Sequence, residues 1–174
     1  MKKILLIVML LSILVPSGAQ SDTMSDDISV HKTDSTVWVD MGLSVKWAST
    51  NVGAARAEDF GECYPFAEVH GKYRIPTLAE MWELVDECDW KWVEQNGHYG
   101  CKVTSPKTNQ SIFFPAAGME GSSGPEGVET SGYYWFLVSE TEECYLKFVS
   151  DEIFLQTNKA PQMFSYYVRL VSEN

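Results

Sequence analysis

The chain has 174 residues, 45 % of them hydrophobic and 13 % aromatic, which supplies a globular core and excludes a disordered protein. It carries 24 acidic residues against 13 basic ones, a formal charge of −11. A surface this acidic repels phosphate groups, so we expect neither nucleic acid nor an anionic lipid surface as a partner.

Residues 1–19 have the pattern of a cleavable secretory signal peptide. Two lysines precede an apolar run over residues 4–15, and Ser17 and Ala19 supply the small residues of a cleavage site before Gln20. The run is shorter than the roughly 20 residues that cross a bilayer, and the alternative interpretation is a buried core helix. We therefore expect an exported protein that is secreted, periplasmic or displayed at the cell surface. Its mature chain would have no membrane span and a formal charge of −13.

The mature chain divides into a tether and one domain. Residues 20–36 are mostly polar, with Ser, Thr and Asp dominating, and this composition is typical of a flexible connection. Strand signals begin at Val37, so we expect a single domain over residues 37–174. Its first strands are expected over 37–39, 43–48 and 63–69.

The clearest local signal marks the start of a helix. Thr77 can cap the first helical amides while the carboxylate of Glu80 reaches back to the amide of the capping residue, which is the capping-box pattern. Apolar residues then recur at helical spacing as far as Cys88. The sequence therefore predicts one amphipathic helix over residues 78–88.

After this helix the sequence has only β signals. We expect strands over 90–93, 100–104, 111–114, 133–139, 144–149, 153–156 and 166–171, with a Gly-, Ser- and Glu-rich loop over 119–132. The fold class is therefore α+β, with one main helix packed on mostly antiparallel β-sheets.

All four cysteines lie in the predicted mature chain, an even number in an oxidising compartment. Two disulfides are expected, and the short loop between Cys88 and Cys101 favours that pair, which leaves Cys63 with Cys144. The alternative is that all four pack as reduced thiols. The cysteines are too widely spaced in sequence to form a structural zinc site.

The sequence contains no specific catalytic or metal-binding motif. Asp86, Glu87 and Asp89 lie where the helix ends, and we interpret them as a solvated face, with calcium binding as the alternative. No histidine stands near an obvious serine or cysteine nucleophile. We expect no enzymatic activity, no cofactor and no metal ion.

Five sequence blocks resemble the Fibrobacter succinogenes major paralogous domain family, and they span nearly the whole domain. The blocks are 39–48 with 51–54 (VDMGLSVKWA and NVGA), 73–77 (YRIPT) with Glu80, 111–118 (SIFFPAAG), 132–135 (GYYW) and 167–171 (YVRLV). The family is similar to C-type lectin-like domains. The resemblance therefore implies a C-type lectin-like fold in which the two ends of the domain meet in a β-hairpin.

The same resemblance bears on activity. Residues 74–77 (RIPT) also look like part of the formylglycine-generating and other sulfatase-modifying enzymes, which share the lectin-like fold and depend on two neighbouring cysteines near the carboxyl end. Only Cys144 lies in that region here, so this enzymatic reading lacks its central chemistry. We interpret Arg74, Thr77, Glu80 and Arg169 as structural, with the two arginines pairing with carboxylates to hold the helix against the terminal strand.

Two functions then remain. The first is a noncatalytic module that binds a glycan or an envelope or host protein. Its candidate ligand-binding residues are the aromatic side chains Trp90, Trp92, Tyr133, Tyr134 and Trp135. Binding would not need calcium, because the Glu-Pro-Asn or Gln-Pro-Asp triplet of calcium-dependent lectins does not occur. The second is a structural or assembly component of the cell envelope. Burial of these aromatic residues would favour the second function over the first.

Overall fold

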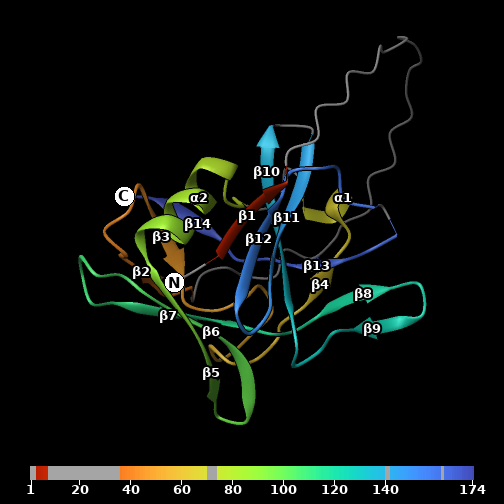
Figure 1. Cartoon of the computed structure of the whole chain (residues 1–174), viewed down its shortest axis with the longest axis horizontal. Helices are drawn as coiled ribbons and strands as arrows, with labels where there is room; N and C mark the ends of the chain where they lie inside the picture. The colour runs from red at the N-terminus through yellow and green to blue at the C-terminus, as the bar shows by residue number, and fades with distance from the viewer. Residues whose placement is uncertain (1–2, 8–35, 70–73, 140–141, 162) are drawn as a thin grey trace.

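Strands are the main regular elements of the described chain, and two helices pack among them (Figure 1). The computed structural model describes residues 3–7, 36–69, 74–139, 142–161 and 163–174. Much of the predicted signal peptide (1–2 and 8–19) and of the predicted tether (20–35) lies outside these ranges. The mixed content confirms the α+β class, with mostly antiparallel sheets.

The largest sheet has six strands and crosses the centre of the molecule (Figure 1). Their order is β1 (Lys3–Ile7), β12 (Glu152–Gln156), β11 (Glu142–Phe148), β10 (Gly132–Ser139), β13 (Tyr166–Tyr167) and β4 (Cys63–Tyr64). Strands β10, β11 and β12 follow one another as antiparallel neighbours, whereas β1 runs parallel to β12. Lys3–Ile7, which belongs to the predicted signal peptide, is therefore an edge strand of this sheet.

A smaller sheet brings the beginning and the end of the domain together. It consists of β14 (Val171–Glu173), β3 (Val45–Ala48) and β2 (Trp38–Val39), all antiparallel. The predicted strand over 43–48 is thus present in shorter form. The first strands of the domain and its last strand therefore lie side by side.

The third sheet follows the main helix and has the order β5 (Asp89–Gln95), β6 (His98–Thr104) and β7 (Ser111–Pro115). Asn96 and Gly97 join the first two strands with positive φ angles of 49° and 89°, the backbone that a tight two-residue hairpin requires. The predicted loop over 119–132 contains a further hairpin of β8 (Met119–Gly121) and β9 (Gly124–Glu126).

The main helix, α2, spans Leu78–Glu87 and begins with the predicted capping box. Its buried residues are Met81, Leu84 and Val85, so one face packs inward as the periodicity indicated. Within the described ranges, no helix is both long and apolar enough to cross a membrane.

The prediction of a strand over 63–69 was wrong beyond Tyr64, because the second half of this range forms a short helix, α1 (Phe66–Val69). Pro65 explains the change. Its fixed φ suits the first turn of a helix, and its carbonyl accepts a hydrogen bond from the amide of Glu68 at 3.1 Å.

The core lies on both faces of the six-stranded sheet, because successive side chains of a strand point to opposite faces. In β10, Tyr134 and Phe136 belong to the cluster shared with α2 and the β5–β6–β7 sheet. Trp135 belongs to the second cluster, together with Tyr64 and Tyr166 from β4 and β13. The second face is the one that also carries the exposed aromatic residues described below.

Candidate functional site

The residues that carried the family resemblance converge on one buried arginine. Arg169 has no exposed surface, and its guanidinium donates to Asn51 Oδ1 at 2.7 Å, to the carbonyl of Phe113 at 2.8 Å and to that of Ala48 at 3.0 Å. The guanidinium also lies 4.4 Å from the centroid of the Phe114 ring, within cation–π range. The arginine therefore links three sequence blocks in the interior.

A buried tyrosine extends this network to a fourth block. Asn51 Nδ2 donates to the hydroxyl of Tyr134 at 3.1 Å and to the carbonyl of Phe60 at 2.8 Å, and the Tyr134 hydroxyl donates to the carbonyl of Pro115 at 2.8 Å. We name Arg169, Asn51 and Tyr134 with these carbonyls the buried polar network. It satisfies polar groups that would otherwise be costly to bury.

The prediction that Arg169 pairs with a carboxylate was wrong, since carbonyl and amide oxygens accept the hydrogen bonds described above. Burial lowers the pKa of Arg169 to about 10, so the group remains charged at neutral pH. Burial also raises the pKa of Tyr134, which keeps its hydroxyl protonated as a donor. Multiple carbonyl acceptors and the Phe114 ring stabilise the cation in place of an anion.

Arg74 does pair with a carboxylate, at the start of α2. Its guanidinium donates to Glu80 through Nη2–Oε1 at 2.6 Å and Nη1–Oε2 at 3.0 Å. Glu80 also accepts the amide of Thr77 at 2.8 Å, which completes the capping box. The amide of Val171 donates to the carbonyl of Arg74 at 3.0 Å, so this corner joins the helix to the terminal strand.

The predicted disulfides are not formed. Cys63 and Cys144 lie on β4 and β11, which are three strand positions apart in the sheet, or about 14 Å. Cys101 lies three residues along β6 from the partner of Asp89, which places it about 10 Å or more from Cys88. Both separations exceed the roughly 7 Å between Cα atoms that a disulfide tolerates. The structure therefore contradicts the predicted pairing, because the sheet order separates these cysteines.

Most of the aromatic residues predicted to bind a ligand pack into the interior. Tyr134 and Trp135 are 0 % and 2 % exposed, and the indole Nε1 of Trp135 donates to the carbonyl of Tyr64 at 2.8 Å. Trp90 is half-buried, with its Nε1 bonded to the carbonyl of Leu84 at 3.1 Å. Trp92 is also half-buried, and its ring stacks on that of Tyr99. Neither Tyr134 nor Trp135 is accessible to an external ligand.

Tyr133 differs, because it lies half-exposed on the opposite face of β10 from Tyr134. Its ring centroid is 5.9 Å from that of Tyr145 on β11, and Lys147 Nζ lies 5.5 Å from the Tyr133 centroid and 5.9 Å from that of Phe154 on β12. We name Tyr133, Tyr145, Lys147 and Phe154 the aromatic surface. All four are half-buried, so each keeps part of its side chain in solvent.

Tyr166 supports the aromatic surface from below. It is 1 % exposed, and its ring lies 5.5 Å from Tyr133 in a stacked arrangement and 4.8 Å from Tyr145. Its other neighbour in the interior is Trp135, at 4.4 Å. The exposed rings are therefore held by buried ones, which limits their freedom before any ligand binds.

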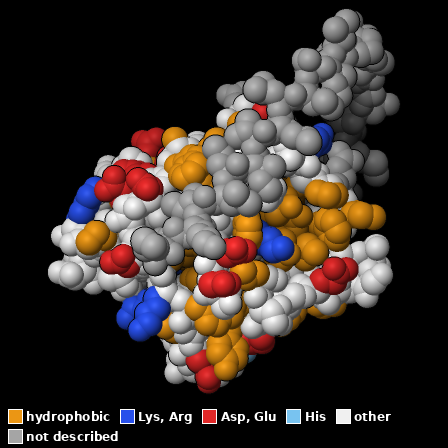
Figure 2. Space-filling view, viewed as in Figure 1, with side chains coloured by type: hydrophobic (Ala, Val, Ile, Leu, Met, Phe, Trp, Pro, Cys, Tyr) orange, Lys and Arg blue, Asp and Glu red, His pale blue; other side chains and the backbone are white. Residues whose placement is uncertain are grey.

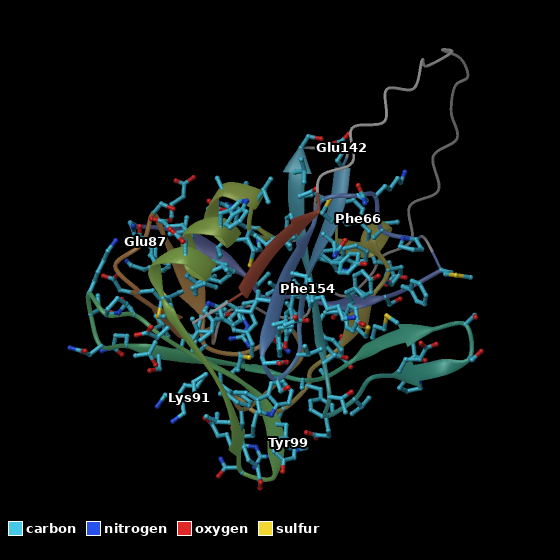
Figure 3. All side chains as sticks on the ribbon, viewed as in Figure 1. Phe66, Glu87, Lys91, Tyr99, Glu142 and Phe154 are labelled. Carbon is cyan, nitrogen blue, oxygen red and sulfur yellow. The ribbon has the colours of Figure 1, made fainter. Side chains whose placement is uncertain are left out.

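The figures show where this surface lies. Phe154 projects from β12 on the side that faces the viewer, while Tyr99 lies at the tip of the β5–β6 hairpin (Figure 3). Apolar side chains gather in the same central region of the space-filling view, beside a basic side chain (Figure 2).

Sequence reasoning found Tyr133 but missed Tyr145, Lys147 and Phe154. A period-two pattern in β11 could have indicated two of them, because Tyr145 and Lys147 alternate with the buried Cys144, Leu146 and Phe148. Phe154 likewise stands between the buried Ile153 and Leu155.

A separate cavity of about 500 Å³ lies between the 48–55 loop and β4. Its lining combines the carboxylate of Glu62 and the hydroxyls of Ser49 and Thr50 with apolar Val52 and Leu170. The Tyr64 hydroxyl donates to Glu62, so part of this lining is already engaged.

The described residues show neither a cluster of metal ligands nor a reactive thiol. In the described part of the chain, no group of three His, Cys, Asp or Glu side chains could hold a metal ion. Cys63 is the cysteine nearest the surface, and burial raises the pKa of its thiol to about 11, which disfavours the reactive thiolate at neutral pH.

Comparison of the chain with protein-family models, with curated proteins and with solved structures found no match.

Proposed function

We propose that the protein is an exported, noncatalytic binding module that recognises a glycan through the aromatic surface, without calcium or any other cofactor. The observation that carries the proposal is the pair of half-exposed rings of Tyr133 and Tyr145, 5.9 Å apart and seated on buried Tyr166. Rigid aromatic rings present apolar area at low entropic cost, and the faces of sugar rings are apolar enough to stack on them.

The charge of the region supports a glycan ligand. The mature chain has a formal charge of −13, so most of its surface disfavours anionic partners, whereas a neutral sugar experiences no such repulsion. Lys147 lies at the middle of the aromatic surface and adds a hydrogen-bond donor for hydroxyl or carboxylate groups.

The proposal includes the family and the fold. The C-type lectin-like fold and membership of the Fibrobacter succinogenes major paralogous domain family are supported by the convergence of Asn51, Pro115, Tyr134 and Arg169 in one buried network. Residues from four separate sequence blocks meet there, which is the behaviour of a motif that specifies a fold. Export by the predicted signal peptide to the periplasm, the cell surface or the medium belongs to the same proposal.

The experiment is binding of the mature chain to a broad glycan array, with and without a calcium chelator. We expect a signal that survives chelation and falls at least about tenfold in Tyr133→Ala and Tyr145→Ala, because each loses one stacking face. Tyr99→Ala is the matched control, since Tyr99 is 42 % exposed and lies on the β5–β6 hairpin away from this surface.

Two outcomes would contradict the glycan proposal. One is a folded sample that binds no glycan. The other is a binding signal that persists in both Tyr133→Ala and Tyr145→Ala but disappears in Tyr99→Ala. Circular dichroism and the unfolding midpoint of each variant separate loss of binding from loss of folding.

A structural or assembly role in the cell envelope is the second candidate. The burial of Tyr134 and Trp135 favours it, because these aromatic residues serve the core instead of a ligand surface. A folded sample that fails the glycan test but retains envelope proteins in a Tyr133-dependent manner would select a protein-binding form of this role.

A further inference from the structure

The edge strand β12 is covered by a segment that the mature protein is predicted to lose. Strand β1 pairs with β12 in parallel over five positions, from Lys3 opposite Glu152 to Ile7 opposite Gln156. Lys3–Ile7 lies within the predicted signal peptide. Cleavage before Gln20 therefore uncovers one whole edge of the six-stranded sheet.

The backbone groups that become free can be identified from the hydrogen bonds on the other side of β12. The amide of Val149 donates to the carbonyl of Glu152 at 3.0 Å, so Glu152 faces β11. Since backbone groups alternate in direction along a strand, Phe154 and Gln156 also face β11, whereas Ile153 and Leu155 face the open edge. These two residues present the groups that a further strand would bond.

The uncovered edge lacks the features that usually protect an edge strand. Strand β12 has the sequence EIFLQ, with no proline, no lysine and no bulge in its pairing with β11. The described members of both core clusters lie between Val39 and Val171, within the chain from Gln20 onward. Cleavage therefore leaves these residues in the mature chain and opens the edge of the sheet.

We propose that signal-peptide cleavage turns β12 into a self-association edge, through which two mature copies pair in antiparallel fashion about Phe154. In this register Ile153 faces Leu155 of the second copy, and Glu152 faces Gln156 of the second copy. The outward amide of Ile153 in one copy then donates to the outward carbonyl of Leu155 in the other, and the amide of Leu155 donates to the carbonyl of Ile153.

The sequence of β12 matches itself in this register, which favours a second copy as the occupant of the edge. Self-pairing centred on Phe154 places each Glu152 opposite the neutral Gln156 instead of a second carboxylate, and it matches apolar residues with apolar ones across the three central positions. Two chains of formal charge −13 repel each other at long range, so these close contacts must supply the affinity. The pairing is isologous and closes as a dimer.

The dimer does not need glycan binding, but it rests on the export and signal-peptide cleavage that belong to the proposed function. Pairing at the edge extends the sheet in its own plane and brings the two Phe154 side chains together, so Tyr133, Tyr145 and Lys147 stay accessible on the sheet face. Two copies of the surface on one dimer would raise avidity for a repeated ligand.

The first experiment compares two forms of the protein by sedimentation equilibrium at up to about 0.5 mM, a range that detects weak association. The chain from Gln20 onward is expected to dimerise, and the full chain, produced without export so that residues 1–19 remain, is expected to stay monomeric. A monomeric mature chain, or equal dimerisation of both forms, overturns the proposal.

The second experiment tests the register with opposite charges at one position. The symmetric dimer contains two contacts between position 156 of one copy and Glu152 of the other, and Gln156→Lys places a cation in each. The Kd of the dimer should therefore fall by about two- to thirtyfold. Gln156→Glu places a second carboxylate there and should raise the Kd by a similar factor. Gln110→Lys and Gln110→Glu make the same charge changes at an exposed site between β6 and β7.

The predicted gain in affinity of Gln156→Lys separates a true contact from damage to the fold. A misfolded protein does not gain a tighter specific dimer, so tightening by Gln156→Lys cannot arise from damage to the fold. A folded Gln156→Lys variant that fails to tighten the dimer, or that changes it no more than Gln110→Lys does, contradicts the register.

Discussion

Two neighbouring tyrosines on β10 have opposite surroundings. Tyr134 is fully buried, and its hydroxyl joins Asn51 and the carbonyl of Pro115, whereas Tyr133 is half-exposed and its ring lies beside Lys147. The buried polar network and the aromatic surface therefore begin one residue apart, on the two faces of one strand. The comparison teaches that residue type in a motif does not separate a structural role from a ligand-binding role.

The difference also separates two kinds of energy. The network holds a charged guanidinium and its acceptors away from water, so the loss of any member leaves polar groups unsatisfied. The four side chains of the aromatic surface are only half-buried, so its residues can change at smaller cost to the fold. Stability should therefore respond strongly to the network and weakly to the surface.

The largest effect is expected from Arg169→Met. It removes the donors to Asn51 Oδ1 and to the carbonyls of Ala48 and Phe113, and we expect the free energy of unfolding to fall by about 3 kcal/mol or more. Urea denaturation measures the change. Arg56→Met is the control, because its side chain is 66 % exposed and solvent screens its ion pair with Asp59. Equal losses in the two variants would contradict the comparison.

The two tyrosines themselves provide the next test. Tyr134→Phe should lower the free energy of unfolding by about 1–2 kcal/mol, because the carbonyl of Pro115 loses its donor in the interior. Tyr133→Phe should change it by less than about 0.5 kcal/mol. Denaturation of both variants under one set of conditions checks the difference. A larger loss of stability in Tyr133→Phe than in Tyr134→Phe would contradict a stabilising role for the buried hydroxyl.

A smaller effect, which depends on pH, is expected at the start of α2. The hydrogen bonds and the charge of Arg74 lower the pKa of Glu80 below its ordinary 4.5 even though burial opposes this shift. The stabilisation is therefore present at neutral pH and is lost as the pH falls from about 4.5 through the folded-state pKa. Glu80→Gln should be less stable than the parent at pH 7 and equal to it in acid.

Unfolding measured across this pH range tests the expectation for Glu80. Glu94→Gln serves as its control, because it removes an exposed carboxylate from β5 and makes the same change in net charge. A stability difference between Glu80→Gln and the parent that stays constant down to the lowest pH would exclude ionisation of Glu80 as the cause.

A small effect on stability is also expected from Lys147→Met on the aromatic surface. Its ammonium group lies 5.5 Å and 5.9 Å from the ring centroids of Tyr133 and Phe154, and an exposed cation–π contact contributes about 0.5–1 kcal/mol at most. Thermal unfolding measures this change. A loss as large as that of Arg169→Met would mean that the aromatic surface belongs to the core.

Local patterns in the sequence predicted local structure well. The Thr77–Glu80 capping box and the helix that follows were predicted because a cap involves residues only three positions apart. Strands such as 100–104 and 111–114 were predicted within a residue or two, since strand propensity is also read over a few residues. Pro65 shows the limit, because the helical turn after it interrupted an apolar stretch that otherwise favoured a strand.

Contacts between distant segments could not be read in this way. The sequence indicated two disulfides from cysteine number and loop length, yet the order of strands places β4 and β11 three positions apart and keeps Cys63 from Cys144. The sequence also indicated five aromatic candidates, of which the structure leaves Tyr133 at the aromatic surface and buries Tyr134 and Trp135.

The sequence by itself determined the α+β class, the position and cap of the main helix, and the acidic character of the surface, because these depend on composition and on neighbours along the chain. The tertiary structure decided which face of β10 is buried, which groups surround Arg169, and that Tyr145, Lys147 and Phe154 join Tyr133. Strand pairing decides these points, because it brings together residues that no local pattern connects.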